Sequence, residues 1–182
     1  MGGILNGEDL VFGRIIGEHS IQQDADRVNP KYETDALGYK LNCGNCTIAY
    51  ELRRRGLNVD AQPQEWMLPD EWVSMFEGFL RQTLTSKTKD EALAEIEQSV
   101  LSWGEGARGA IYGVPDGECK GHFFSVEVNA GKAMFVDSQV GEIDVRWYFN
   151  GLEPSSIIYG RLDNLKPALN VINAVKTREA QP

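Results

Sequence analysis

Two cysteines, Cys43 and Cys46, lie three residues apart in the stretch LNCGNCTIAYELRRRG. Cysteines at this spacing can be metal ligands, a redox pair, a nucleophile with a neighbour, or small residues of an apolar core. Asn42 directly precedes the first of them and is a residue type that favours the N-cap of a helix. Because a helix N-terminus stabilises the thiolate, which is the reactive form of cysteine, this position suits a nucleophile.

The rest of the chain argues against a metal site and against a redox pair at these cysteines. It holds three cysteines and two histidines, whereas a structural zinc site is built from four ligands. A redox CxxC is expected just after a strand, but the preceding stretch NPKYETDALGYKL is polar and rich in turn-forming residues. The third cysteine, Cys119, lies in a loop-like stretch, and we take it as incidental. We predict no metal site.

A second group of reactive side chains lies in GHFFSVEVNAGKAMFVDSQVG. Its two arms alternate in polarity around a turn centred on Ala130 and Gly131, which predicts a β-hairpin. In that register His122 lies opposite Gln139, and Asp137 shares their face at the end away from the turn. A slip of one residue would move Asp137 to the other face.

Cys43, His122 and Asp137 together are a set that can perform nucleophilic catalysis. An imidazole beside a cysteine takes the thiol proton, and a carboxylate orients the imidazole. Taken singly, His122 is equally well a surface residue at a strand start, and Asp137 a turn residue. Cys46 stays a second candidate for the nucleophile. We favour Cys43 because the effect of the helix dipole fades within the first turn.

Helix-like patterns come first in the chain and strand-like patterns follow. Apolar spacing with Gly56 as a stop predicts a helix from about Cys43 to Arg55. Further helices are predicted in PDEWVSMFEGFLRQTL and in TKDEALAEIEQSVLSW, where Thr88 and Glu91 form a capping box. Strands are predicted in LNVDAQP, RGAIYGV, both hairpin arms and IIYGRLDN. This order predicts an α+β fold with N-terminal helices packed on an antiparallel β-sheet.

Length and composition suit one soluble domain, with 182 residues, 42% hydrophobic and 25% charged. We expect it over residues 29–167, after an irregular arm or junction at 1–28 and before a tail at 168–182. A net charge of −9 argues against nucleic acid as a partner. No apolar run is long enough for a membrane span. The N-terminus lacks the basic and apolar segments of a secretory signal peptide.

The motifs together resemble the papain-fold toxin domain of the glutamine deamidase type. This domain occurs in bacterial polymorphic toxins, and similar segments occur in phage minor head proteins. The matching features are N-C-x-x-C with its E-L-R-R-R-G exit, G-H before a strand, D-x-Q-x-G, and the closing GRLDNLKP. One departure is Ser138, where the family commonly has proline. The resemblance spans about residues 29–167.

The resemblance implies a papain-like cysteine enzyme that deamidates a glutamine of a target protein. It carries the roles of nucleophile, base and orienting group onto Cys43, His122 and Asp137. Gln139 would order the site or bind substrate, and Asn42 would help backbone N–H groups to bind the oxyanion. No cofactor is needed.

The resemblance further implies delivery into a target cell as part of a larger toxin, action in the cytoplasm, and a cognate immunity protein. Two alternatives stay open. One is a cysteine protease of the same fold, because its chemistry shares the acyl-enzyme. The other is a non-enzymatic module of a phage or secretion assembly.

Overall fold

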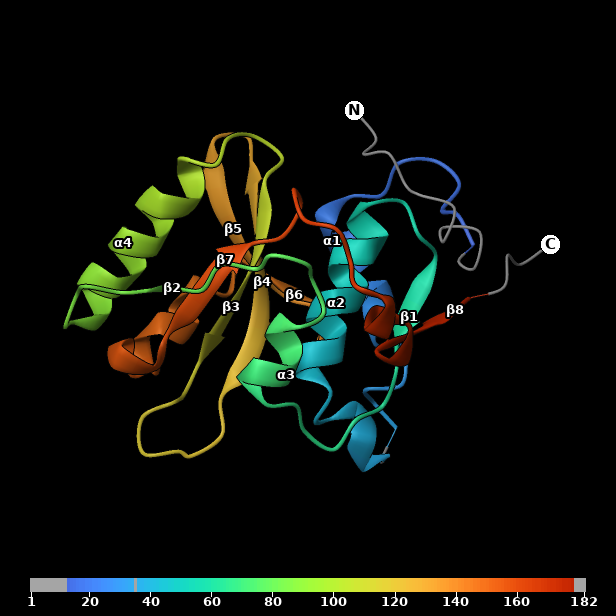
Figure 1. Ribbon diagram of the computed structural model, residues 1–182, viewed down its shortest axis with the longest axis horizontal. Coiled ribbons are helices and arrows are strands. Elements are labelled where there is room, and N and C mark those ends of the chain that lie inside the picture. Colours follow the sequence, from blue (N-terminus) through green and yellow to red (C-terminus); the bar gives the residue numbers. More distant parts are fainter. Residues whose placement is uncertain (1–12, 35, 179–182) are drawn as a thin grey trace.

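The computed structural model describes residues 13–34 and 36–178 (Figure 1). The helices are α1 (Ile21–Val28), α2 (Cys43–Arg54), α3 (Pro69–Val73) and α4 (Lys89–Leu101), with the 3-10 helices η2 (Leu37–Tyr39), η3 (Val145–Asn150), η4 (Pro154–Ser156) and η5 (Leu169–Asn173). The strands are β1 (Val59–Ala61), β2 (Gln82–Thr83), β3 (Arg108–Gly113), β4 (His122–Asn129), β5 (Lys132–Asp137), β6 (Glu142–Ile143), β7 (Ile158–Arg161) and β8 (Val175–Thr177).

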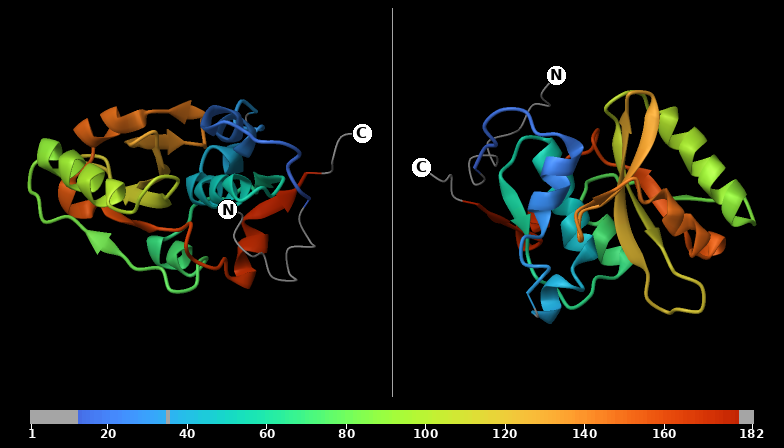
Figure 2. Two further views of the ribbon diagram at one scale, coloured as in Figure 1. Left: turned by 90° about the horizontal axis from the view of Figure 1, so that it is seen from above. Right: turned by 180° about the vertical axis from the view of Figure 1, so that it is seen from behind.

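A six-stranded antiparallel sheet in the order β2-β7-β3-β4-β5-β6 forms the middle of the molecule. Helix α4 covers one face of this sheet, and α1, α2 and α3 lie on the other side (Figures 1 and 2). A small sheet of β1 and β8 lies beyond α2. Helices packed on an antiparallel sheet confirm the predicted α+β class.

The β4–β5 hairpin has the predicted register near its turn. Asn129 pairs with Lys132, and the ladder continues to the pair of Ser125 with Val136. Both turn residues have positive φ, 51° at Ala130 and 71° at Gly131, as a two-residue turn of type I′ requires. The prediction is wrong at the far end. There Asp137 pairs with Glu142 of β6, and Gln139 lies beyond the end of β5 instead of facing His122.

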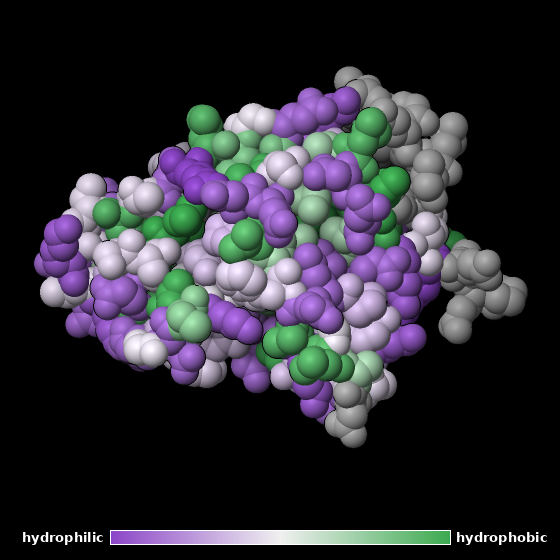
Figure 3. All heavy atoms as spheres, turned by 60° about the horizontal axis from the view of Figure 1, so that its bottom comes forward, coloured by the Kyte–Doolittle hydropathy of each residue, from purple (hydrophilic) through white to green (hydrophobic). Residues whose placement is uncertain are grey.

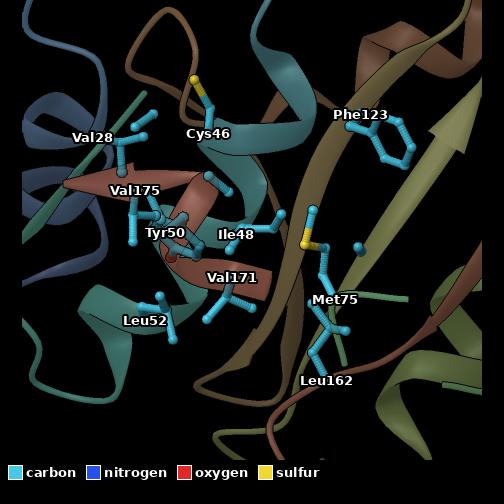
Figure 4. Close-up of a cluster of buried hydrophobic side chains, with 14 of the residues drawn as sticks. Val28, Cys46, Ile48, Tyr50, Leu52, Met75, Phe123, Leu162, Val171 and Val175 are labelled. Atoms are coloured by element: carbon cyan, nitrogen blue, oxygen red, sulfur yellow. The ribbon is translucent and has the colours of Figure 1, made fainter. Parts of the chain in front are cut away.

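Both faces of the hairpin are buried, one against each helical layer. Phe124 and Phe135 belong to an apolar cluster with α4 and η3 residues. Phe123 and Val136 belong to a second cluster that includes α2. Figure 4 shows part of this second cluster, in which Ile48 of α2 points towards Met75. The face that carries Phe124 and Phe135 is therefore turned towards α4, and α2 packs on the opposite face.

Helix α2 is the central element of the second cluster. It begins at Cys43, as predicted, and every residue up to Arg53 is buried. Gly56 ends it with a φ of +90°, a conformation that costs glycine little. Gly44 lets α3 approach closely, because a Cβ there would come within 3.2 Å of the Trp72 ring. The Trp72 indole nitrogen also donates to the Gly44 carbonyl at 3.0 Å.

Residues 21–28 are helical, so the predicted irregular arm is wrong for that segment. Ser20 and Gln23 cap α1 reciprocally. The buried carboxylate of Asp24 then joins α1 to α2. It accepts from Arg53 Nε at 3.1 Å and from Arg54 Nη1 at 3.0 Å. Residues 1–12 lie outside the described part of the chain.

Replacing Asp24 by alanine is expected to lower the free energy of unfolding by about 3 kcal/mol, because it leaves buried guanidinium charge unpaired. Urea unfolding followed by circular dichroism measures this. Asp26→Ala is the matched control, since Asp26 is exposed on the same helix, and its expected cost is below about 0.5 kcal/mol. Equal costs for the two variants would contradict a structural role for the Asp24 ion pairs.

Two other predictions differ from the structure. The helix predicted from Pro69 onwards stops at Val73, and the chain then turns at Gly78, where φ is +77°. The predicted tail includes β8, which pairs antiparallel with β1. Both differences come from contacts between distant segments, which residue periodicity does not encode.

No helix in the described ranges is long and apolar enough to cross a bilayer. Figure 3 brings the bottom of Figure 1 forward and shows apolar side chains in small groups between polar ones.

Candidate active site

Helix α2 packs against β4, and each of these elements begins with a candidate site residue, Cys43 and His122. Cys43 is the first residue of α2 and is 8% exposed. The first backbone N–H groups of a helix have no partner within the helix. Cys43 therefore lies beside free hydrogen-bond donors that also favour negative charge.

His122 and Asp137 are joined directly by a hydrogen bond. Nε2 of His122 lies 2.7 Å from Oδ2 of Asp137. His122 is the first residue of β4 and Asp137 the last of β5, so the hairpin brings both to its open end. Asp137 is buried, whereas a quarter of the His122 side chain is exposed.

Cys43 contacts the same imidazole. Burial by itself lowers the pKa of His122, but hydrogen bonds with Asp137 and with Cys43 outweigh it and raise the pKa to about 10. Because Nε2 is held by Asp137, Nδ1 is the nitrogen left to face the sulfur. The imidazole is therefore poised as a cation at neutral pH, between a carboxylate and a thiol.

Asp137 is held as an anion by several donors. Burial favours its neutral form, but the bond from His122 and further hydrogen bonds lower the pKa of the carboxyl group. Its Oδ1 accepts from the Gln139 backbone N–H at 3.0 Å. The Ser138 hydroxyl donates to the Cys46 carbonyl at 3.1 Å. This serine thus ties the Asp137 segment to α2.

Cys46 differs from Cys43 in its surroundings. It is 1% exposed, and burial is the main cause that raises its pKa well above the usual value. Its thiol lies 3.4 Å from Asn42 Oδ1, to which it donates. These contacts are those of a protonated core thiol. Cys119 is exposed.

The amides of Asn42 and Gln139 are buried and bonded to each other at 3.3 Å. Asn42 does not cap α2 with its side chain, contrary to the prediction. Its Nδ2 donates instead to Asn29 Oδ1 and to the Gln62 carbonyl. Asn29 in turn donates to the Gln139 carbonyl at 3.0 Å. The network joins the segments on either side of Cys43 and orders the start of the helix.

Sequence reasoning missed Asn29 and Tyr148. The Tyr148 hydroxyl donates to Asp137 Oδ2 at 2.7 Å. No motif signals this contact, because Tyr148 lies on η3, outside the hairpin. Asn29 is the first residue of the stretch that carries the resemblance, but in the sequence an asparagine before a proline resembles any turn residue.

Among the described residues, no group of three or more His, Cys, Asp or Glu side chains is arranged to hold a metal ion. The arrangement instead places a thiol next to an imidazole that is hydrogen-bonded to a carboxylate. Such an arrangement can activate a sulfur nucleophile and transfer its proton.

Comparison with known families identifies one match. The model of the family described as papain fold toxin 1, glutamine deamidase, matches residues 41–142, which is more than half of the chain. No curated protein and no solved structure matches. The matched range includes Cys43, His122 and Asp137 and the whole hairpin. The chain therefore belongs to the papain-fold toxin glutamine deamidase family.

Proposed function

We propose that this domain hydrolyses the side-chain amide of a glutamine on a target protein. In this proposal Cys43 is the nucleophile, His122 the general base and acid, and Asp137 the group that orients the imidazole. The observation that carries it is the hydrogen bond of His122 to Asp137, together with the interaction of the same imidazole with Cys43 at the start of α2. Membership of the glutamine deamidase family supports the choice of substrate.

The first step forms a carbon–sulfur bond. His122 holds the proton from Cys43, and the thiolate attacks the carboxamide carbon, whose carbonyl electron pair moves to oxygen. Backbone N–H groups in the first turn of α2 bind this oxyanion. The Asn42 amide donors are already engaged by Asn29 and Gln62. We therefore assign Asn42 to support of the helix start.

The second step breaks the carbon–nitrogen bond. Nδ1 of His122 gives its proton to the departing ammonia, which leaves a thioester on Cys43. The neutral imidazole then takes a proton from water, and the hydroxide adds to the thioester carbon. Collapse of that intermediate expels the thiolate and yields a glutamate side chain. Throughout, Asp137 stays ionised and keeps Nε2 of His122 in place.

We assign Gln139 an ordering role within this mechanism. Its side chain is 8% exposed and donates to Asn42 Oδ1, and its backbone N–H holds Asp137. Both contacts face the interior of the protein. Of the two roles implied by the family resemblance, ordering the site fits these contacts better than binding substrate.

The catalytic domain, expected over residues 29–167, is proposed to include α1 and β8 as well. Asp24 on α1 is ion-paired with α2, and β8 pairs with β1. As a toxin domain it acts on a target protein. We propose that it is delivered into the target cell as part of a larger toxin, acts in the cytoplasm, and is blocked there by an immunity protein.

Mass spectrometry of treated proteins tests the reaction. A bacterial lysate incubated with the domain is expected to yield peptides in which a glutamine gains about 1 Da, as expected when hydrolysis replaces the amide by a carboxylate. The same lysate treated with the Cys43→Ala variant is the control. New peptide termini without that mass gain would favour the protease alternative. If neither the mass gain nor new peptide termini are found, the result would favour the non-enzymatic assembly module.

A further inference from the structure

Tyr148 contacts the carboxylate of the proposed catalytic set, although it lies outside the sequence motifs that predicted the set. Its hydroxyl donates to Oδ2 of Asp137 at 2.7 Å. The same oxygen is 2.7 Å from Nε2 of His122. Two donors therefore share one carboxylate oxygen, while the other oxygen is held by the Gln139 backbone.

The Tyr148 ring also limits the movement of the imidazole. It meets the His122 ring edge-on, with centroids 5.9 Å apart. On another side, Phe124 is stacked with His122 at 6.3 Å. Phe124 and Tyr148 contact each other edge-on at 5.6 Å. The imidazole therefore packs against two aromatic rings that also contact each other.

The element that carries Tyr148 is anchored to the rest of the fold. Val145 and Phe149 of η3 are buried in the cluster between the sheet and α4. Arg146 forms an ion pair with Glu97 of α4 at 2.8 Å. Tyr148 is thus held on a packed element and reaches Asp137 from a fixed direction.

The surrounding charges keep the Tyr148 hydroxyl protonated. Burial is the largest of the causes that raise the pKa of Tyr148. Asp137 on β5, Glu142 on β6 and Tyr32 before α2 raise it further. The hydroxyl therefore remains a donor through the neutral range. The ionisable groups that interact with the His122 imidazole are Asp137 and Cys43.

We propose that Tyr148 is a positioning residue of this site: its hydroxyl shares Oδ2 of Asp137 with His122 and so limits how firmly the carboxylate retains the imidazole proton. The inference rests on the proposed roles of Cys43, His122 and Asp137. A donor to a carboxylate withdraws part of its negative charge from any other donor. Without that donor the imidazolium would be held more strongly, and it would release its proton to ammonia more slowly.

Proton NMR of the two histidine rings tests this in the full chain. In Tyr148→Phe, the titration midpoint of His122 is expected to rise by about half a pH unit or more. His19 is the internal reference, because it contacts Asp24 and lies in another network. Tyr159→Phe is the matched control, since Tyr159 is buried beside Trp103. It should leave both midpoints unchanged.

An unchanged or lower His122 midpoint in a folded Tyr148→Phe variant would overturn the inference. If that variant does not fold, Tyr148→Gln and Tyr148→Met replace it. Gln keeps a donor and Met of similar length does not, so the midpoint should be higher in the Met variant. Equal midpoints there would overturn the inference too.

The titration needs no target protein, so it is separate from the proposed function. If wild-type Cys43 is alkylated rapidly but the His122 midpoint is unchanged in Tyr148→Phe, only the inferred role of Tyr148 is wrong. A Cys43 that reacts no faster than an ordinary thiol defeats the proposed function itself.

Discussion

Replacing Cys43 by alanine is expected to abolish both rapid alkylation and glutamine deamidation, whereas Cys46→Ala should keep most of each. Cys43 contacts the imidazole at the start of α2. Cys46 is buried, and its raised pKa keeps it a thiol that donates to Asn42. A sulfur without an accessible thiolate does not attack a carbonyl carbon. The two cysteines are one helical turn apart, so the contrast isolates their surroundings.

This comparison is made in a Cys119→Ala background. Cys119 is exposed and free, and it would otherwise contribute ordinary thiol reactivity. The reactivity of each remaining cysteine is measured as its initial rate of alkylation by iodoacetamide at pH 6, followed by intact mass. The Cys46→Ala protein is expected to lose only about 1 kcal/mol of stability, as a small core truncation does. If the Cys43→Ala variant is still labelled rapidly, the nucleophile is Cys46 and not Cys43.

Replacing His122 by alanine is expected to slow alkylation of Cys43 at pH 6 by about two orders of magnitude. A free cysteine with a pKa near 8.5 is only about 0.3% thiolate at pH 6. An imidazolium partner holds the sulfur as an anion at that pH. The pKa of His122 is raised to about 10, with Asp137 and Cys43 as the causes that outweigh burial. The imidazole therefore stays charged through neutral pH.

The pH dependence makes this prediction specific. Above about pH 9 a free thiol ionises unaided, so the gap between wild type and His122→Ala should narrow there. His19→Ala is the matched control, because the other histidine contacts Asp24 and Arg53 rather than Cys43. Its expected rate equals that of wild type. A constant gap at every pH would indicate that His122 affects access to Cys43 rather than its ionisation.

The catalytic set alone does not choose between deamidation and proteolysis. In both reactions a sulfur attacks an amide carbon and an imidazole protonates the leaving nitrogen. What differs is which amide the rest of the site admits. For this chain the choice rests on family membership, and for that reason the mass gain at glutamine is the decisive observation.

The amino-acid sequence by itself determined the parts of the site that depend on local patterns. A helix beginning at Cys43 follows from apolar spacing and from Gly56. The hairpin and its register near the turn follow from alternation and from Ala130-Gly131. Because such signals repeat within a few residues, they can be read along one segment. They were enough to predict an α+β fold and to propose Cys43, His122 and Asp137.

Only the tertiary structure decided which segments meet. It buries Cys46 under the amide of Asn42, turns the predicted substrate contact Gln139 inward, and brings Tyr148 to the carboxylate. It also makes a capped helix of residues 21–28. Each of these outcomes depends on packing between segments far apart in the chain. Desolvation and hydrogen-bond partners at such contacts are properties of the folded molecule, and no periodicity along the sequence records them.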